Sequence, residues 1–250
     1  MRIKQAYIGK QVKHFPWFET FGVVDYMDVY APTVFFGCYT RTDFENALYH
    51  QGEGVMYWAG RDVLKWKKEQ LQELKRYRHV TGLPMVAEFL RKNGIEPVMV
   101  KPHMFSGLKV NPVKKQNKIY SYYQRNGVYS VNGNTEIDQY LQKRYTIQIP
   151  QDRINWEDWY GGVCEGYYNC FVGLMLDDFG RGATTIKDLG LRGIRCVTNV
   201  IALPNTIPWK TKEDIYKAIQ QEQEKVGTID GKLAQEVWDC LDTEYEWLEI

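Results

Sequence analysis

Short apolar runs alternate with amphipathic stretches along most of this chain, which predicts an α/β protein. Strands that alternate with helices favour parallel sheets joined by crossover helices. Apolar runs typical of strands occupy residues 4–8, 22–25, 33–36, 55–58, 96–100, 118–123, 145–149, 171–176 and 194–198. Helical periodicity predicts helices over residues 42–51, 63–78, 86–92, 135–143, 184–192, 212–225 and 233–248.

The order of these elements indicates two lobes. Residues 102–116 are rich in Pro, Gly, Asn and Lys and show little periodicity, so they are the best candidate for a linker. We therefore expect one lobe over residues 1–101 and a second over residues 117–250, with the helix at 233–248 closing the chain. The helix at 42–51 is expected to be capped by Thr42, with Glu45 as the capping-box partner.

The most informative stretch lies between residues 170 and 199. An apolar strand runs into a turn that contains Gly180 and Gly182, and a helix then opens on Thr184 and Thr185. The start of a helix presents unpaired backbone N–H groups and a positive dipole end, which suit a phosphate. The plainer alternative is an ordinary helix start in a doubly wound domain.

Charge is divided unevenly although the net charge is only +1. Residues 1–150 hold 22 Lys and Arg against 13 Asp and Glu, and residues 151–250 hold 10 against 18. The halves therefore carry +9 and −8. A basic stretch at 65–78, with Trp66 and Tyr77 among its cations, fits an acidic polymer such as nucleic acid, or else a solvated basic helix. The aromatic content of 14% favours surfaces that stack flat ligands or sugars, or fills the core.

Several classes of protein are disfavoured. No apolar run reaches bilayer length, and the amino terminus lacks the long apolar core of a signal peptide, so we expect a cytoplasmic protein with no membrane partner. The five cysteines are widely spaced and the four histidines are scattered, so no metal site is expected. No dinucleotide fingerprint and no P-loop is present, which argues against hydride transfer and ATP hydrolysis.

The second half resembles the donor-binding domain of the two-Rossmann (GT-B) glycosyltransferases, of the small type found in viruses and phages. The first half matches more loosely, through residues 32–37, 50–52 and 58–62. The resemblance in the second half is carried by the strand at 119–123, the strand at 171–176 with Asp178, the turn and helix start at 180–185, Asp188-Leu-Gly190, Asn199, residues 204–206 and residues 213–215.

This resemblance implies a transferase that moves a sugar from a nucleotide-sugar, with a UDP-sugar favoured, to a hydroxyl acceptor and requires no cofactor. Two positions depart from the family: Asp188 stands where a Glu is usual, and Arg181 lies inside the glycine turn. The residues expected to bind the donor are Tyr122, Gly173, Asp178, Gly180, Arg181, Gly182, Thr184, Thr185 and Asp188.

An inverting enzyme of this kind would take a general base from the first lobe. Asp62 is the first candidate, and His50 and Asp43 follow; if configuration is retained, no such base is needed. The alternative for Asp62 is the N-cap of the helix that starts at Val63. The residues expected to contact the acceptor are Tyr39, Arg61 and Lys65.

The acceptor and the enzymatic role itself remain open at this stage. A basic first lobe suits double-stranded DNA that carries a hydroxymethylated base, as in a phage genome, and such a base must leave the helical stack before chemistry. A glycan acceptor is the alternative among enzymes. The competing non-enzymatic interpretation is a nucleic-acid-binding protein on a nucleotide-binding fold.

Overall fold

The chain divides into two compact units in the structure, a computed structural model. Unit 1 comprises Met1–Gly107 and Leu241–Ile250, and unit 2 comprises Leu108–Cys240. This division differs from the expected one in the last ten residues, which belong to unit 1. The structure describes residues 2–9, 12, 17–103, 109–121, 135–148, 170–176 and 183–249.

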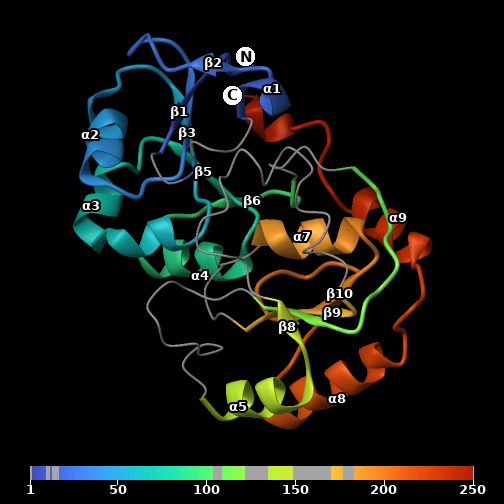
Figure 1. The fold of residues 1–250 in the computed structure, drawn as a ribbon. Coiled ribbons are helices and arrows are strands. Elements are labelled where there is room, and N and C mark those ends of the chain that lie inside the picture. Colours follow the sequence, from blue (N-terminus) through green and yellow to red (C-terminus); the bar gives the residue numbers. More distant parts are fainter. Residues whose placement is uncertain are drawn as a thin grey trace. The chain divides into compact units, whose positions relative to one another are not determined.

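Unit 1 is built on a six-stranded sheet in which every neighbouring pair is parallel (Figure 1). The spatial order is β2-β1-β3-β4-β5-β6, so the direction of winding reverses between β1 and β3. The strands are β1 (Gln5–Ile8), β2 (Val24–Asp25), β3 (Thr33–Phe36), β4 (Gly54–Tyr57), β5 (Arg78–Thr81) and β6 (Val98–Met99).

The helices of unit 1 correct two predictions. α2 is capped by Thr40 rather than Thr42, because the Thr40 hydroxyl accepts a hydrogen bond from the Asp43 N–H and the Asp43 carboxylate accepts one from the Thr40 N–H. The helix predicted at 63–78 is two short helices followed by β5. The helices of this unit are α1 (Trp17–Phe21), α2 (Arg41–Tyr49), η2 (Arg61–Lys65), α3 (Lys68–Glu73), α4 (Pro84–Lys92) and η4 (Glu246–Leu248).

β5 escaped the sequence pattern because two of its three buried residues, His79 and Thr81, are polar. His79 is buried, and its Nδ1 accepts a hydrogen bond from the Trp58 indole N–H at 2.9 Å. The Thr81 hydroxyl donates to the backbone carbonyl of Trp58 at 3.0 Å. Since both side chains have partners, their burial carries no unmet polar group.

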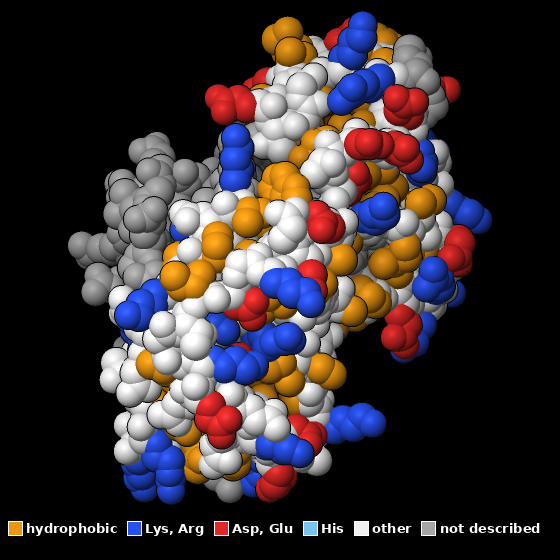
Figure 2. Space-filling model, turned by 90° about the vertical axis from the view of Figure 1, so that its right-hand side faces the viewer, with side chains coloured by type: hydrophobic (Ala, Val, Ile, Leu, Met, Phe, Trp, Pro, Cys, Tyr) orange, Lys and Arg blue, Asp and Glu red, His pale blue; other side chains and the backbone are white. Residues whose placement is uncertain are grey.

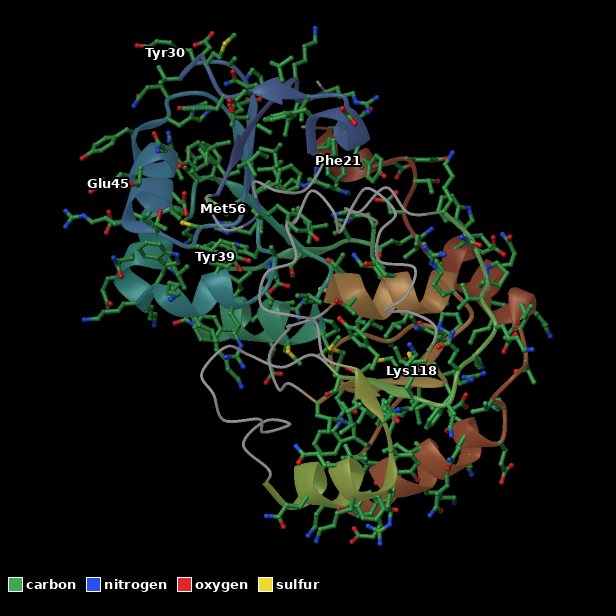
Figure 3. All side chains as sticks on the ribbon, in the orientation of Figure 1. Phe21, Tyr30, Tyr39, Glu45, Met56 and Lys118 are labelled. Carbon is green, nitrogen blue, oxygen red and sulfur yellow. The ribbon has the colours of Figure 1, made fainter. Side chains whose placement is uncertain are left out.

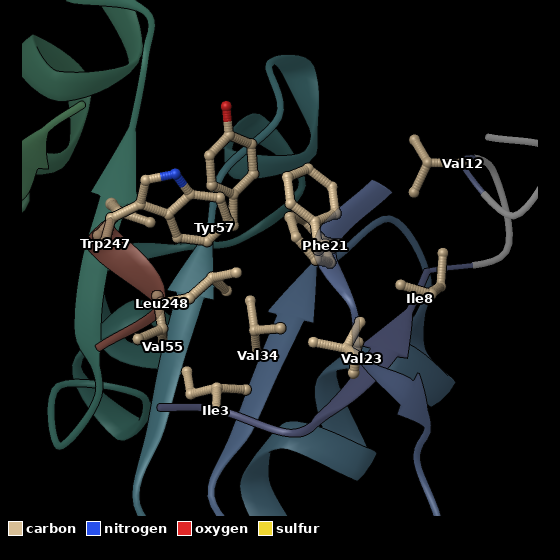
Figure 4. Packing of buried hydrophobic residues seen from close by; sticks show 13 residues of the cluster. Ile3, Ile8, Val12, Phe21, Val23, Val34, Val55, Tyr57, Trp247 and Leu248 are labelled. Atoms are coloured by element: carbon tan, nitrogen blue, oxygen red, sulfur yellow. The ribbon is translucent and has the colours of Figure 1, made fainter. Parts of the chain in front are cut away.

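One face of the sheet in unit 1 is covered by the end of the chain. Phe21 of α1 lies 4.6 Å from Tyr245 and 5.8 Å from Trp247, measured between ring centroids. Trp247 and Leu248 are buried there against Val55 and other strand residues (Figure 4). The helix predicted at 233–248 therefore ends at Asp239, because the residues that follow turn to cover this sheet.

Unit 2 is built on a five-stranded parallel sheet in the order β11-β10-β9-β7-β8. Counted from its first strand, this is the order 2-1-3-4-5, and unit 1 has the same order with one more strand. The prediction of an α/β protein with parallel sheets is confirmed, and the order is the second common one of doubly wound sheets. The strands are β7 (Ile119–Ser121), β8 (Ile147–Gln148), β9 (Val172–Met175), β10 (Arg195–Thr198) and β11 (Thr206–Ile207).

Helices cover both faces of the sheet in unit 2 (Figure 1). α5 and α8 share one apolar cluster through Ile137 and Ile215, and Tyr140 stacks on Tyr216 at 3.9 Å between centroids. α7 and α9 pack on each other at the opposite face. The helices are α5 (Thr135–Arg144), α7 (Ala183–Leu191), α8 (Lys212–Gln223) and α9 (Gly231–Asp239).

Residues 109–116 of the expected linker are bound to unit 2, whereas Pro102 and His103 belong to unit 1. The backbone N–H groups of Asn111, Val113 and Lys115 donate to carbonyls of Leu191, Arg192 and Thr228 at 3.0, 3.1 and 3.0 Å. This alternate-residue pairing fixes the segment although its sequence lacks periodicity. Residues 109–116 of the predicted linker are therefore an ordered part of unit 2, and residues 104–108 lie outside the described residues.

A buried charge cluster stands at the amino edge of the same sheet. Glu222 near the end of α8 forms ion pairs with Lys115 at 3.8 Å and with Arg195 at 3.7 Å, and a closer one with Lys225. Burial lowers the pKa of Lys115, and the Glu222 charge opposes that shift. One carboxylate therefore joins the linker, β10 and the end of α8.

Glu222→Gln should lower the free energy of unfolding of unit 2 by about 3 kcal/mol, because it leaves a buried lysine without its counter-charge. Urea denaturation of the full chain measures the loss. Glu224→Gln, on an exposed position two residues further along, is the matched control and should change stability little. Equal stability of the two variants would contradict a structural role for the cluster.

Candidate functional site

Glycines follow the central strands of unit 1 at the carboxyl edge. A Cβ on Gly9, after β1, would lie 2.5 Å from the carbonyl oxygen of Gly37, after β3. Gly37 itself has a φ of 71°, a backbone conformation that side chains with a Cβ rarely adopt. The two loops at the reversal of winding can therefore approach each other only because both positions are glycine.

Asp62 lies at this edge and is fully buried. Its carboxylate accepts hydrogen bonds from the backbone N–H groups of Gly60 at 2.8 Å and of Cys38 and Ala59 at 3.2 Å each. Burial raises the pKa of Asp62 to about 6, and the backbone hydrogen bonds limit the rise. The structure places this candidate base among backbone donors of two loops, so its geometry fits loop fixation better than proton abstraction.

Asp43 holds the same loop from the other side. Its carboxylate accepts from the backbone N–H groups of Tyr39 at 2.9 Å and Thr40 at 2.8 Å, and from the Tyr7 hydroxyl at 3.0 Å. Two of the three candidate catalytic residues, Asp43 and Asp62, are thus brought to one loop. Both carboxylates accept hydrogen bonds from backbone N–H groups of that loop.

His50 is not brought to this edge. It caps the carboxyl end of α2, which starts after β3 and runs back to the amino ends of the strands. Its Nδ1 lies 3.3 Å from the Tyr26 hydroxyl and its Nε2 lies 3.4 Å from the Glu53 carbonyl oxygen. Burial lowers the pKa of His50. The structure therefore separates His50 from both aspartates.

The candidate acceptor residues lie on the loops that Asp62 and Asp43 fix. Tyr39 follows β3 and is half-buried (Figure 3), Arg61 follows Gly60 and is half-buried, and Lys65 at the end of η2 is exposed. Burial raises the pKa of Tyr39 well above its ordinary range. Tyr30, at the opposite end of β3, is 72% exposed.

At the carboxyl edge of unit 2, α7 begins after β9 and the reversal of winding lies between β7 and β9. Thr184 and Thr185 occupy the first turn of α7, with Thr184 half-buried and Thr185 buried. The remaining candidates of this turn lie outside the described residues. These are Tyr122, Asp178, Gly180, Arg181 and Gly182.

Gly173 and Asp188 do not lie at the start of α7 as Thr184 does: Gly173 is in β9, and Asp188 is in the second half of α7. A Cβ on Gly173 would lie 2.4 Å from Leu189 Cδ1, so this glycine lets α7 pack closely on β9. Asp188 is fully buried in α7 beside Lys187. Burial lowers the pKa of Lys187 to about 8, and the charge of Asp188 opposes the shift. α7 is therefore a buried helix that carries two charged side chains.

Asn205, which is fully buried before β11, lies in the segment 204–206 that carries the resemblance, but no role was assigned to it from the sequence. Its side-chain N–H groups donate to the carbonyls of Ile186 at 2.9 Å and Ile194 at 3.2 Å, on either side of the α7–β10 turn. A Cβ on Gly190 would lie 2.8 Å from Asn205 Cγ. In the sequence this Asn stands between Pro204 and Thr206, and nothing in that local pattern marks it as a buried hydrogen-bond donor.

Two negative findings apply to the parts of the chain that the structure describes. There, no cluster of three or more His, Cys, Asp or Glu side chains could hold a metal ion. In the same segments, no helix has both the length and the apolar character that crossing a membrane requires.

Asp62→Asn should remove one component of the pH dependence of stability. Because the pKa of Asp62 is raised from 3.8 to about 6 on folding, its contribution is fully present below about pH 4 and is lost as pH rises through about 6. Relative to the wild type, D62N should therefore gain about 3 kcal/mol in free energy of unfolding between about pH 4 and pH 7.

Urea denaturation across that pH range is the measurement. Asp214→Asn is the control, because backbone hydrogen bonds lower the pKa of Asp214 and give its contribution the opposite sign: present at neutral pH and lost as pH falls. A stability difference between D62N and the wild type that does not vary with pH would contradict the burial of a titrating Asp62.

Gly173→Ala should lower the free energy of unfolding by about 2 kcal/mol, since the added methyl group overlaps Leu189. In a Leu189→Ala background, the same substitution should cost much less because the cavity accepts the methyl group. A double-mutant cycle measured by urea denaturation separates the cost of the overlap with Leu189 from any other cost of an alanine at position 173. An equal loss in both backgrounds would show that Gly173 does not serve this packing contact.

Comparisons with known proteins complete the description. No family model matches the chain, and no curated protein matches it. Among solved structures, it is similar to the Glycosylation Associate Protein (Gap123) complex from Streptococcus agalactiae, with a TM-score of 0.48 and 12% sequence identity. The match covers 89% of this chain and 54% of that one, so this chain spans about half the length of its neighbour. The neighbour is thus a glycosylation-associated protein, and the likeness is weak.

Proposed function

We propose that this chain is a nucleotide-sugar-dependent glycosyltransferase that binds its donor at the carboxyl edge of the sheet in unit 2. The observation that carries the proposal is the reversal of winding between β7 and β9. In open doubly wound sheets, ligands bind outside the carboxyl ends of the strands at such a reversal. α7 starts at this edge and offers its first-turn backbone N–H groups to a diphosphate.

The side chains of α7 support a phosphate or sugar contact at its start and a structural role further along. Thr184 is half-buried in the first turn, so its hydroxyl can reach a ligand oxygen. Lys187, one turn later, adds a buried cation to the helix. Positive groups and helix N-termini stabilise a leaving diphosphate in transfer reactions. Residues 171–190 resemble the GT-B enzymes in sequence, and for this reason we propose a nucleotide-sugar as the ligand.

In unit 1, Tyr39 and Arg61 form the proposed contacts to the acceptor. They stand on loops that Asp43 and Asp62 hold through backbone hydrogen bonds. A group that binds here is positioned by a fixed loop, which lowers the entropic cost of transfer. In this proposal Asp62 is a positioning residue that holds the loops carrying Tyr39 and Arg61. The acceptor is a compound with a free hydroxyl group.

A thermal-shift screen with UDP-, GDP-, CMP- and dTDP-linked sugars tests donor binding. A ligand that binds only the folded protein raises the melting temperature by mass action, so one nucleotide class should raise it. For that donor, Thr184→Val should weaken binding roughly tenfold in isothermal calorimetry, because a hydrogen bond to a charged group is lost.

Thr228→Val is the matched control. The Thr228 hydroxyl donates to the Lys225 carbonyl in an exposed turn at the other end of the sheet, so donor affinity should not change. If no nucleotide-sugar shifts the melting temperature, the proposed function fails. If T184V and T228V bind the donor equally, the site is misplaced.

Nucleic-acid binding is the second candidate function, favoured by the exposed lysines Lys65, Lys67, Lys68 and Lys75. Two other cations of the stretch have structural partners: Arg76 bonds backbone carbonyls at the end of α2, and Arg78 bonds the Glu249 carbonyl. On the face shown in Figure 2, basic and acidic side chains are interspersed. Binding to duplex DNA through these lysines should weaken steeply with salt, and absent binding at low salt would remove DNA as acceptor or partner.

A further inference from the structure

The Asp62 carboxylate occupies a ring of backbone donors. The donors are the backbone N–H groups of Cys38, Ala59 and Gly60. These three donors come from the loop after β3 and the loop after β4, and they surround a side chain with no exposed surface. Converging backbone N–H groups of this kind form anion-binding concavities in proteins.

The corresponding loop of unit 2 contains no such carboxylate. Both units share the strand order 2-1-3-4-5, so β10 corresponds to β4 by its place in the sheet. β10 is followed by residues 199–205, which include no Asp or Glu. The side chains there that bond backbone are neutral: the Asn199 amide pairs with the Trp209 backbone, and the Asn205 amide with Ile186 and Ile194.

We propose that the Asp62 carboxylate is an internal ligand of unit 1, filling the anion position that the loops after β3 and β4 create. Unit 1 therefore keeps these loops in place without a bound phosphate. The corollary, that an anionic part of the substrate binds in unit 2, rests on the proposed function. The internal-ligand role stands on the hydrogen bonds of unit 1 alone.

The charges around this position favour the binding of one carboxylate and disfavour a second anion. The ionisable groups that face Asp62 are Cys38, Tyr39 and Tyr57, and burial raises the pKa of each, so all three are neutral near pH 7. Asp43, across the Cys38–Tyr39 loop, is the nearby anion. A second anion would be repelled by both aspartates, whereas removal of the Asp62 carboxylate leaves three donors with no acceptor.

Asp62→Ala with added formate tests the proposal in the full chain. The substitution removes the carboxylate and leaves a space of the size of formate beside the backbone donors. The melting temperature of D62A should fall below that of the wild type, and sodium formate should restore much of the loss in a saturable manner. Sodium chloride at the same ionic strength should not, and the wild type should respond equally to both salts.

Two further variants keep the test decisive. Asp62→Asn fills the space with an amide, so its stability should not depend on formate. Asp214→Ala removes an exposed carboxylate that also accepts two backbone N–H groups, from Lys210 and Thr211, where water can replace it. It too should show no formate response. If D62A does not fold in chloride, its folded fraction by circular dichroism should recover in formate.

Equal effects of formate and chloride on D62A, whether on melting temperature or on recovery of the fold, would overturn the internal-ligand role. Because no nucleotide-sugar takes part, this result does not depend on donor binding. Donor affinity of D62A is measured separately. It should equal that of the wild type if the donor binds in unit 2, and a loss with intact formate rescue would count against the proposed donor site only.

Discussion

The parallel direction of all paired strands is the constraint on which the rest of the structure depends. It places the carboxyl ends of the central strands at one edge in each unit, and with them the loops that carry most of the candidate residues. Because helices must return to the other edge before the next strand, residues that close a helix are removed from that edge. His50 closes α2 and so lies away from Asp62, although only twelve positions separate them in sequence.

At the loops of unit 1, burial and backbone hydrogen bonding have opposite effects on the pKa of Asp62. Burial alone would keep Asp62 protonated, and the backbone donors stabilise its charged form. Asp43 meets the same requirement through a capping box and a tyrosine hydroxyl. Two carboxylates thus fix the loop at Cys38–Thr40, and this explains why acidic residues near a candidate site need not perform the chemistry.

Much of the fold could be predicted because continuous apolar runs mark buried parallel strands. Residues 33–36 and 171–176 were recognised in this way, and α8 at Lys212–Gln223 lies within the amphipathic run predicted over residues 212–225. The α7 helix was predicted over residues 184–192 from its threonine start, and the structure has it at Ala183–Leu191.

The remaining features depend on contacts between distant residues. β5 buries His79 and Thr81, whose partner Trp58 directly follows another strand, β4, and Trp247 draws the chain end onto the sheet of unit 1. The hydrogen bonds of Asp62 come partly from Cys38, which no local pattern connects to it. At the site, the sequence placed most of its candidate residues at the carboxyl edge of each sheet, which stays a prediction, and it did not distinguish a packing glycine such as Gly173 from a ligand-binding one.

Hydrogen–deuterium exchange with and without the nucleotide-sugar selected by thermal shift tests the central claim most directly. The account predicts slower exchange of backbone amides at the start of α7, around Ala183–Thr185, and unchanged exchange in the Cys38–Thr40 loop that the aspartates already hold. Protection confined to the loops of unit 1, or absent from the start of α7, would contradict it.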